Sequence, residues 1–240
     1  MNESRKRAGA PDDAPSRPRL PKGSGDLLRD QIIDAATELI LASQDAKTPS
    51  TREVTRALGI TAPTLYRHFA DKEELLAAVC AKYYRQLGQA MRDATRGVPT
   101  ALERLHALGM AYVRFAVATP LMYRVATDTA PRQPNEFDET LINSAFVHLQ
   151  HTVQELIDEA FFPPTDSLGP ALQLWAAAHG VASLLVTRPY LPWGDAEAFA
   201  SSVLRAVCLG QAVDGLDLTT LLPRPCSDQV GTARANNEAT

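Results

Sequence analysis

The stretch 60–70 contains no acidic side chain and offers several groups that can bind nucleic acid. Its polar members are hydroxyl, aromatic, guanidinium and imidazole side chains at Thr61, Thr64, Tyr66, Arg67 and His68. Such groups donate hydrogen bonds to phosphates, contact base edges or lie against a thymine methyl group. If they share the outer face of one helix, the stretch predicts a surface that binds DNA.

A second group of side chains has the spacing of a metal site. His148, His151 and Glu155 fall at positions i, i+3 and i+7, so they share one face of a helix. Imidazole and carboxylate groups placed in this way can hold a transition metal. Glu103 and His106 form an E-x-x-H pair, which is half of a di-iron bundle site, but the sequence has no second copy. A helical metal-binding protein or enzyme that uses His148, His151 and Glu155 is therefore the alternative function.

The composition argues against most other classes of function. The chain of 240 residues carries 28 acidic and 24 basic side chains, a net charge of −4 that excludes general coating of nucleic acid. Residues 1–95 hold 15 bases against 13 acids, so the relatively basic part comes first. Three widely spaced cysteines argue against a disulfide framework and a zinc ribbon. No phosphate-binding glycine loop or hydrolase motif occurs, so we expect a protein that is not an enzyme. No apolar signal segment occurs either, so we expect the protein in the cytoplasm.

The elements that would position the acid-free stretch are three short helices. Apolar residues at helical spacing predict the first over 26–43. Ser50 and Glu53 have the spacing of a capping box that opens the second, and Gly59 stands where it must end. Thr61 can cap a third helix over Ala62–Phe69, and a second capping box over Asp71–Glu74 opens a long helix. This is a helix-turn-helix pattern.

The rest of the chain is predicted to be helical too. The expected segments are Thr100–Thr119, Leu121–Ala126, Phe137–Phe161, Leu168–Thr187 and Asp195–Gln211, with a structured stretch at Leu216–Leu222. No strand-like alternation is present. The prediction is therefore an all-α protein, in which a three-helix helix-turn-helix domain is joined by a long helix to a C-terminal helical domain.

The sequence over residues 50–76 resembles the DNA-binding domain of the TetR family of bacterial repressors. The motif is Thr64-Leu65-Tyr66-Arg67-His68-Phe69 followed by Asp71-Lys72-Glu73-Glu74-Leu75. The run from Leu174 to Val181, with its Trp and His-Gly, is similar to one ligand-domain subgroup of that family. With the charge pattern, the resemblance implies four segments: a basic arm (1–25), the DNA-binding domain (26–76), a ligand-binding and dimerisation domain (77–222) and a polar tail (223–240).

The resemblance also implies which residues contact DNA. Mapped one by one, and with the outward Thr61 added, the predicted contacts are Thr51, Arg52, Thr61, Ala62, Pro63, Thr64, Tyr66, Arg67, His68 and Lys72. Ala62 departs from the polar residue that some members place there, so specificity at this position would be apolar or absent. The basic arm is either a solvated tail or a further DNA contact.

A single helix-turn-helix contacts few base pairs, so we expect a homodimer on a palindromic operator. The helices near 168–187 and 195–211 are predicted to form the dimer interface, because small residues such as Ala176, Ala178, Gly180 and Ala182 permit close approach. We expect a repressor that a small-molecule effector releases from DNA, and no cofactor. The candidate effector-binding residues are Tyr112, Phe115, Met122, Tyr123, Phe146, His148, His151 and Trp175.

Overall fold

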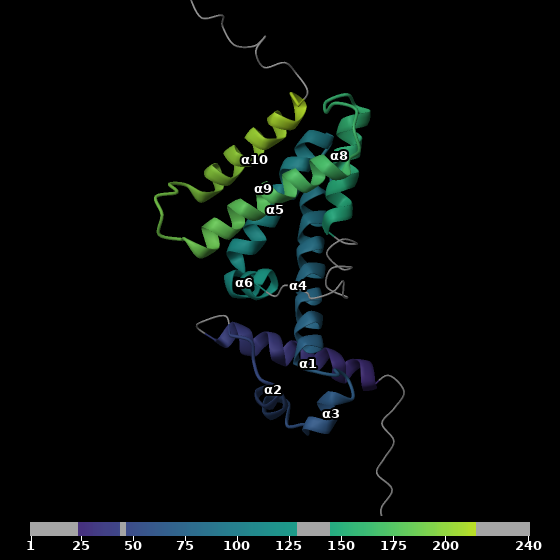
Figure 1. Cartoon of the computed structure of the whole chain (residues 1–240), viewed down its shortest axis with the longest axis vertical. Coiled ribbons are helices and arrows are strands. Elements are labelled where there is room, and N and C mark those ends of the chain that lie inside the picture. Colours follow the sequence, from purple (N-terminus) through teal and green to yellow (C-terminus); the bar gives the residue numbers. More distant parts are fainter. Residues whose placement is uncertain (1–23, 44–46, 129–144, 215–240) are drawn as a thin grey trace, which may run out of the picture. The chain divides into compact units, whose positions relative to one another are not determined.

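The computed structural model describes residues 24–43, 47–128 and 145–214, and Figure 1 shows the arrangement of their helices. The helices are α1 (Ser24–Ala42), α2 (Thr51–Leu58), α3 (Ala62–Tyr66), α4 (Lys72–Thr95), α5 (Ala101–Ala118), α6 (Pro120–Asp128), α8 (Val147–Asp158), α9 (Leu168–Thr187) and α10 (Ala196–Ala212). The described residues include no strand, which confirms the predicted all-α class. Contacts divide the chain into two compact units, Met1–Val79 and Cys80–Thr240, with α4 crossing the boundary.

The first unit is a three-helix cluster around a small apolar core. α1 contributes Ile32, Ile33, Ala36 and Ile40, which are all at least 98% buried. Val54, Leu65 and Phe69 fill the same core from α2, from α3 and from just beyond α3, with no more than 1% of each exposed. The guanidinium of Arg29 lies 5.0 Å from the centre of the Phe69 ring and covers its outer side.

The turn between α2 and α3 forms as the sequence predicts. The Glu53 amide donates to the Ser50 hydroxyl while the Ser50 amide donates to the Glu53 carboxylate, so both halves of the capping box are present. Gly59 ends α2 with φ of +63°, a left-handed conformation that side chains other than glycine rarely adopt. These two local signals fix where the second helix starts and stops.

Two details of the predicted caps are wrong. Thr61 makes no side-chain hydrogen bond to the backbone of α3, because its hydroxyl is 2.9 Å from that of Thr64. At the start of α4 the Glu74 amide donates to Asp71 as expected, but the Glu74 carboxylate accepts from the Ala70 amide, one residue before the predicted partner. The helix α3 also ends at Tyr66 rather than at Phe69.

The second unit is built around α9, which packs against α5, α8 and α10 (Figure 1). One apolar cluster joins these helices through Leu105, Val153, Leu156, Leu174 and Cys208. A Cβ on Gly109 would lie 2.9 Å from the side chain of Leu204, so this glycine lets α5 approach α10 closely. The layer of helices around α9 is what shapes the cavity described below.

Four predicted segments fall partly or wholly outside the described residues. The long helix expected over Phe137–Phe161 is described only from residue 145, and α8 spans Val147–Asp158. The expected structured stretch Leu216–Leu222, the polar tail, and the basic arm up to residue 23 are not described. The other predicted helices are confirmed to within two residues at each end, apart from α3.

Membrane-spanning length alone does not distinguish α9 from a core helix. By length and composition α9 could cross a membrane, and the bent pair α5 and α6, at 103°, would be a second candidate if taken as one span. In the structure α9 contacts three neighbouring helices of its own unit. We therefore assign it to the core of the second unit.

Candidate nucleic-acid interface and ligand cavity

The polar side of α3 faces away from the core of the first unit. Leu65 is fully buried, whereas the next residue, Tyr66, is 50% exposed. Thr61, Ala62, Pro63 and Arg67 are exposed as well, and Thr64 and His68 are half-buried. The structure therefore brings together the residues of the acid-free stretch on one outer surface, as the predicted DNA contacts require.

The start of α2 and the start of α4 carry the remaining predicted contacts. Arg52 is exposed and Thr51 is half-buried. The ammonium of Lys72 donates to the Thr48 hydroxyl at 3.0 Å and to the Thr48 carbonyl at 3.4 Å, which ties α4 to the segment before α2. An ammonium has three donors, so one is left for a phosphate oxygen.

A single acid lies within residues 47–70, and it is occupied by the helix cap. The carboxylate of Glu53 accepts from the Ser50 hydroxyl at 2.6 Å and from the Ser50 amide at 2.7 Å. These hydrogen bonds lower the pKa of Glu53, so it is ionised at neutral pH. Its charge stabilises the positive end of α2 rather than pairing with Arg52 or Arg67.

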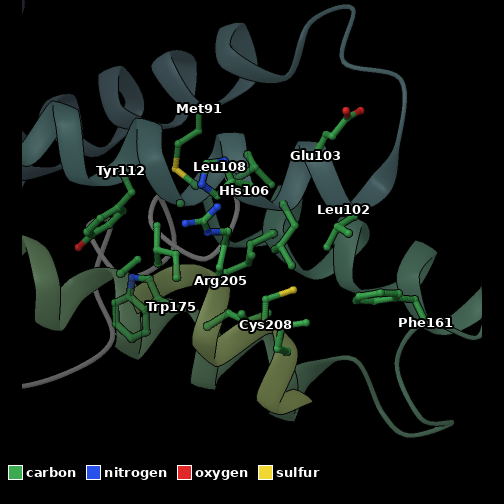
Figure 2. Close-up of a pocket in the computed structure, with 17 residues that line it drawn as sticks. Met91, Leu102, Glu103, His106, Leu108, Tyr112, Phe161, Trp175, Arg205 and Cys208 are labelled. Atoms are coloured by element: carbon green, nitrogen blue, oxygen red, sulfur yellow. The ribbon is translucent and has the colours of Figure 1, made fainter. Parts of the chain in front are cut away.

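A cavity of about 400 Å³ lies in the second unit among α4, α5, α8, α9 and α10 (Figure 2). Its lining residues are Met91, Leu102, Glu103, Leu105, His106, Leu108, Gly109, Tyr112, Leu149, Phe161, Leu174, Trp175, Ala178, Leu204, Arg205, Cys208 and Leu209. The lining is mainly aliphatic and aromatic, with few polar groups. Volume and lining are typical of a small-molecule site, for which cavities of roughly 300–1,000 Å³ are usual.

Two of the eight predicted effector-binding residues, Tyr112 and Trp175, line this cavity. The other six lie elsewhere. Phe115 packs against Tyr83 with ring centres 5.2 Å apart, and Met122 is buried. Phe146 lies edge-on to the outer side of Trp175, at 6.4 Å.

The remaining three predicted residues are also outside the cavity lining. Tyr123 is buried against His179, His148 is half-buried, and the side chain of His151 is 73% exposed. The lining instead includes Arg205, which the sequence motifs do not single out, and His106, which they indicate only as half of a metal motif. A basic residue among the small apolar residues of the last helix is the signal that could have identified Arg205.

Behind the cavity wall, two tyrosines and a histidine form a polar cluster. The hydroxyls of Tyr112 and Tyr123 each lie 3.1 Å from Nδ1 of His179, and the Tyr123 hydroxyl donates to the His179 carbonyl at 3.2 Å. Burial raises the pKa of Tyr112 and raises that of Tyr123 to about 12, and it lowers the pKa of His179. All three groups are therefore uncharged at neutral pH, and the two tyrosine hydroxyls hold the His179 side chain in place.

The alternative metal site does not assemble among the described residues. Glu155 forms an ion pair with Arg104 at 2.7 Å, and Nδ1 of His151 lies 3.6 Å from the other carboxylate oxygen. Within the part of the chain that the structure describes, no three His, Cys, Asp or Glu side chains are grouped so that they could hold a metal ion. Glu155 instead ties α8 to the start of α5.

Comparisons with known proteins agree with both parts of this geometry. A family model described as bacterial regulatory proteins of the tetR family matches residues 32–79. A second, described as the tetracyclin repressor-like C-terminal domain, matches residues 105–207. The chain belongs to the TetR family. The predicted resemblance is thereby confirmed, and the protein is a DNA-binding transcriptional regulator of the ligand-responsive TetR type.

Individual relatives of this TetR-family chain are distant. It is 22% identical over 131 residues to the nucleoid occlusion factor SlmA of Aliivibrio fischeri, covering 55% of this chain and 67% of SlmA. It is 30% identical over 107 residues to the transcriptional activator FasR of Mycolicibacterium smegmatis, covering 45% of this chain and 47% of FasR.

Solved TetR-family structures share the fold. The regulator FadR of Bacillus subtilis, in complex with stearoyl-CoA, superposes with a TM-score of 0.61 at 21% identity. The match covers 75% of this chain and 98% of FadR. TetR-family regulators are transcription factors rather than enzymes.

Proposed function

We propose that the protein is a homodimeric repressor that binds a palindromic operator in the cytoplasm and leaves it when a small molecule enters the cavity of the second unit. The observation that carries the proposal is the outward, acid-free face of α3, with Tyr66 and Arg67 exposed beside buried Leu65. A helix of this kind fits the major groove, where its side chains meet base edges. Arg52 and Lys72 flank it and can bind phosphates, which position the protein without specifying sequence.

Support for a dimer comes from the outer face of α9. Leu172, Ala176 and Leu184 lie on this face and are exposed, with Gly180 half-buried between them. Apolar side chains of this kind, gathered around small residues, mark a surface that another protein covers. The exposed Ala206 and Gly210 of α10 are equally small. Two α9–α10 pairs from two chains would form a four-helix interface with twofold symmetry.

Two small residues predicted for that interface are not on it. Ala178 is 5% exposed and Ala182 fully buried, because both face the core of their own unit. A charge placed at either residue would therefore unfold the subunit rather than separate two subunits. Ala176 is the residue at which the interface is best tested.

The cavity supports the effector part of the proposal. It is lined by helices of the second unit, and α4, which carries Met91 in the lining, begins at Lys72. An effector that shifts α4 would change the spacing of the two α3 helices of a dimer, which are the proposed recognition helices. Such coupling between two distinct sites is usually worth about 1–3 kcal/mol. The FadR of Bacillus subtilis, which shares the fold, was solved with stearoyl-CoA bound, and this likeness favours a small-molecule site here.

The proposal is tested by selecting DNA from a pool of random duplexes with the full-length protein. We expect the bound sequences to converge on an inverted repeat whose half-sites are centred about one helical turn, 10–10.5 base pairs, or a multiple of it apart. Binding should weaken steeply with salt, as contacts to phosphates require. A pool that does not converge, or converges on a single unrepeated site, would contradict the palindromic operator.

A further inference from the structure

One part of the cavity wall differs in charge from the rest. Arg205 and His106 both belong to the lining, and Figure 2 shows the guanidinium of Arg205 beside the imidazole of His106. The two groups are close enough that the positive charge of Arg205 disfavours protonation of His106. Around them the lining is apolar, with Met91 and Leu108 nearby in the same view.

Arg205 carries a charge that the described residues do not neutralise. No carboxylate of the described residues lies within ion-pair distance of it. Arg114 provides the contrast: its guanidinium binds Glu197 through two hydrogen bonds, at 2.8 and 2.6 Å. Arg205 is exposed and also lines the cavity, so its guanidinium, which has no carboxylate beside it, is available to a planar, two-oxygen anion from outside the chain.

The lining also contains Glu103 and His106, and neither cancels that charge. Glu103 belongs to the capping box of α5, where its carboxylate accepts from the Thr100 hydroxyl at 2.8 Å, and it points away from the cavity in Figure 2. His106 is bonded through Nε2 to the Ser201 hydroxyl at 3.0 Å. Burial, with Arg205 and Arg114 nearby, lowers the pKa of His106, so it is neutral at pH 7. The net charge around Arg205 and His106 is therefore positive.

From this arrangement we infer that the cavity takes an anion with an apolar body, whose carboxylate or phosphate group is bound by Arg205 while the body fills the apolar lining. The neutral imidazole of His106 adds a hydrogen-bonding group beside the same head. This inference names the chemical class of the effector and rests on the proposed function of the cavity. It excludes cationic ligands, which Arg205 would repel. The cavity would then select ligands by the charge of the head group, whatever apolar body they carry.

Four probes with the same ten-carbon chain separate head group from body: decanoate, decyl phosphate, 1-decanol and decyltrimethylammonium. Each is titrated calorimetrically into the full-length protein without DNA, below its micelle concentration. We expect at least one of the two anions to bind at least tenfold more tightly than 1-decanol, and the cation to bind more weakly than the alcohol. The difference between decanoate and decyl phosphate identifies which acid group fits. Equal affinity for all four heads, or preference for the cation, would overturn the inference.

Variants locate the effect on Arg205. Arg205→Gln should abolish the preference for the anions while 1-decanol still binds, and Arg205→Lys should restore part of it because the charge returns. Arg114→Gln is the matched control, since that guanidinium is already neutralised by Glu197 and lies outside the lining. A preference that survives Arg205→Gln would overturn the assignment of Arg205. Because these titrations contain no DNA, their outcome is independent of whether the protein binds an operator.

Discussion

Two neighbouring residues of α3 have different roles, one in folding and one in the proposed binding of DNA. Leu65 is fully buried and belongs to the core of the first unit, whereas half of the Tyr66 surface is exposed. A half-exposed ring contributes little to a core but can contact a sugar, a phosphate or a thymine methyl group. Substitutions at the two positions should therefore affect different properties.

Tyr66→Ala should reduce affinity for the selected operator at least tenfold while leaving the unfolding temperature nearly unchanged. The measurement is fluorescence anisotropy with the labelled duplex at fixed salt. The matched control is Tyr190→Ala, since that ring is 99% exposed in the second unit and should not affect DNA binding. Equal operator affinity in wild type and Tyr66→Ala would remove Tyr66 from the DNA-binding surface.

Histidines should make the folded state sensitive to mild acid. Burial lowers the pKa of His179, and it is also the main cause of the lowered pKa values of His106 and His148. The unfolded chain, with an ordinary histidine pKa of about 6.5, then binds more protons than the folded one. The stabilisation is complete above that pH and is lost as the pH falls below it.

We therefore expect the unfolding temperature to fall between pH 7 and pH 5, before carboxylates titrate. His179→Gln should lower stability at pH 7, because the bonds to Tyr112 and Tyr123 change, but it should also flatten the pH dependence. Thermal unfolding at several pH values measures both effects. A slope in His179→Gln as steep as in wild type would show that His179 does not contribute to it.

At the scale of helices, local capping sets the position of the recognition helix. The capping box of α2 fixes where that helix begins, and left-handed Gly59 fixes where it ends. Ser50→Ala should cost about 1 kcal/mol of stability, as removal of an N-cap hydroxyl generally does. Thr61→Ala is the comparison, because the Thr61 side chain makes no cap hydrogen bond and its loss should cost clearly less. Chemical denaturation compares the two variants, and equal losses would contradict this account of the caps.

The outer face of α9 makes a prediction about assembly. Ala176→Arg should give a folded monomer, because the new charge would lie without a partner in the proposed interface. Val117→Arg, on an exposed position of α5, is the matched control and should remain dimeric. Analytical ultracentrifugation with circular dichroism distinguishes monomer, dimer and unfolded chain. A fully dimeric, folded Ala176→Arg protein would show that the interface lies elsewhere.

Across the whole molecule, what could be predicted from sequence depended on the range of the interactions. Helix ends at Ser50 and Gly59 depend on neighbours a few residues away, so their pattern is visible in the sequence. The exposure of Thr61, Tyr66 and Arg67 follows from the pattern of one short segment, and the contact of these residues with DNA stays a prediction. The predicted domain boundaries at residues 26–76 and 77–222 likewise stay predictions.

The cavity was much harder to predict, for a physical reason. Apolar residues such as Phe115 and Met122 recur at the same helical spacing whether they fill a core or line a cavity. Which of the two they do depends on packing between helices that are distant in the sequence. Arg205 and His106 meet because α10 lies against α5, about a hundred positions earlier in the chain. Nothing in either local sequence shows that contact.

The central claim, that two helix-turn-helix units act together on one operator, is tested by a single comparison. The selected palindrome and a duplex with one half-site scrambled are titrated with the protein while the mass of each complex is measured. We predict two chains on the palindrome and at least a tenfold loss of affinity when one half-site is scrambled, since each mismatched base pair costs about 1–3 kcal/mol. One chain per duplex, or equal affinity for both duplexes, would contradict the account.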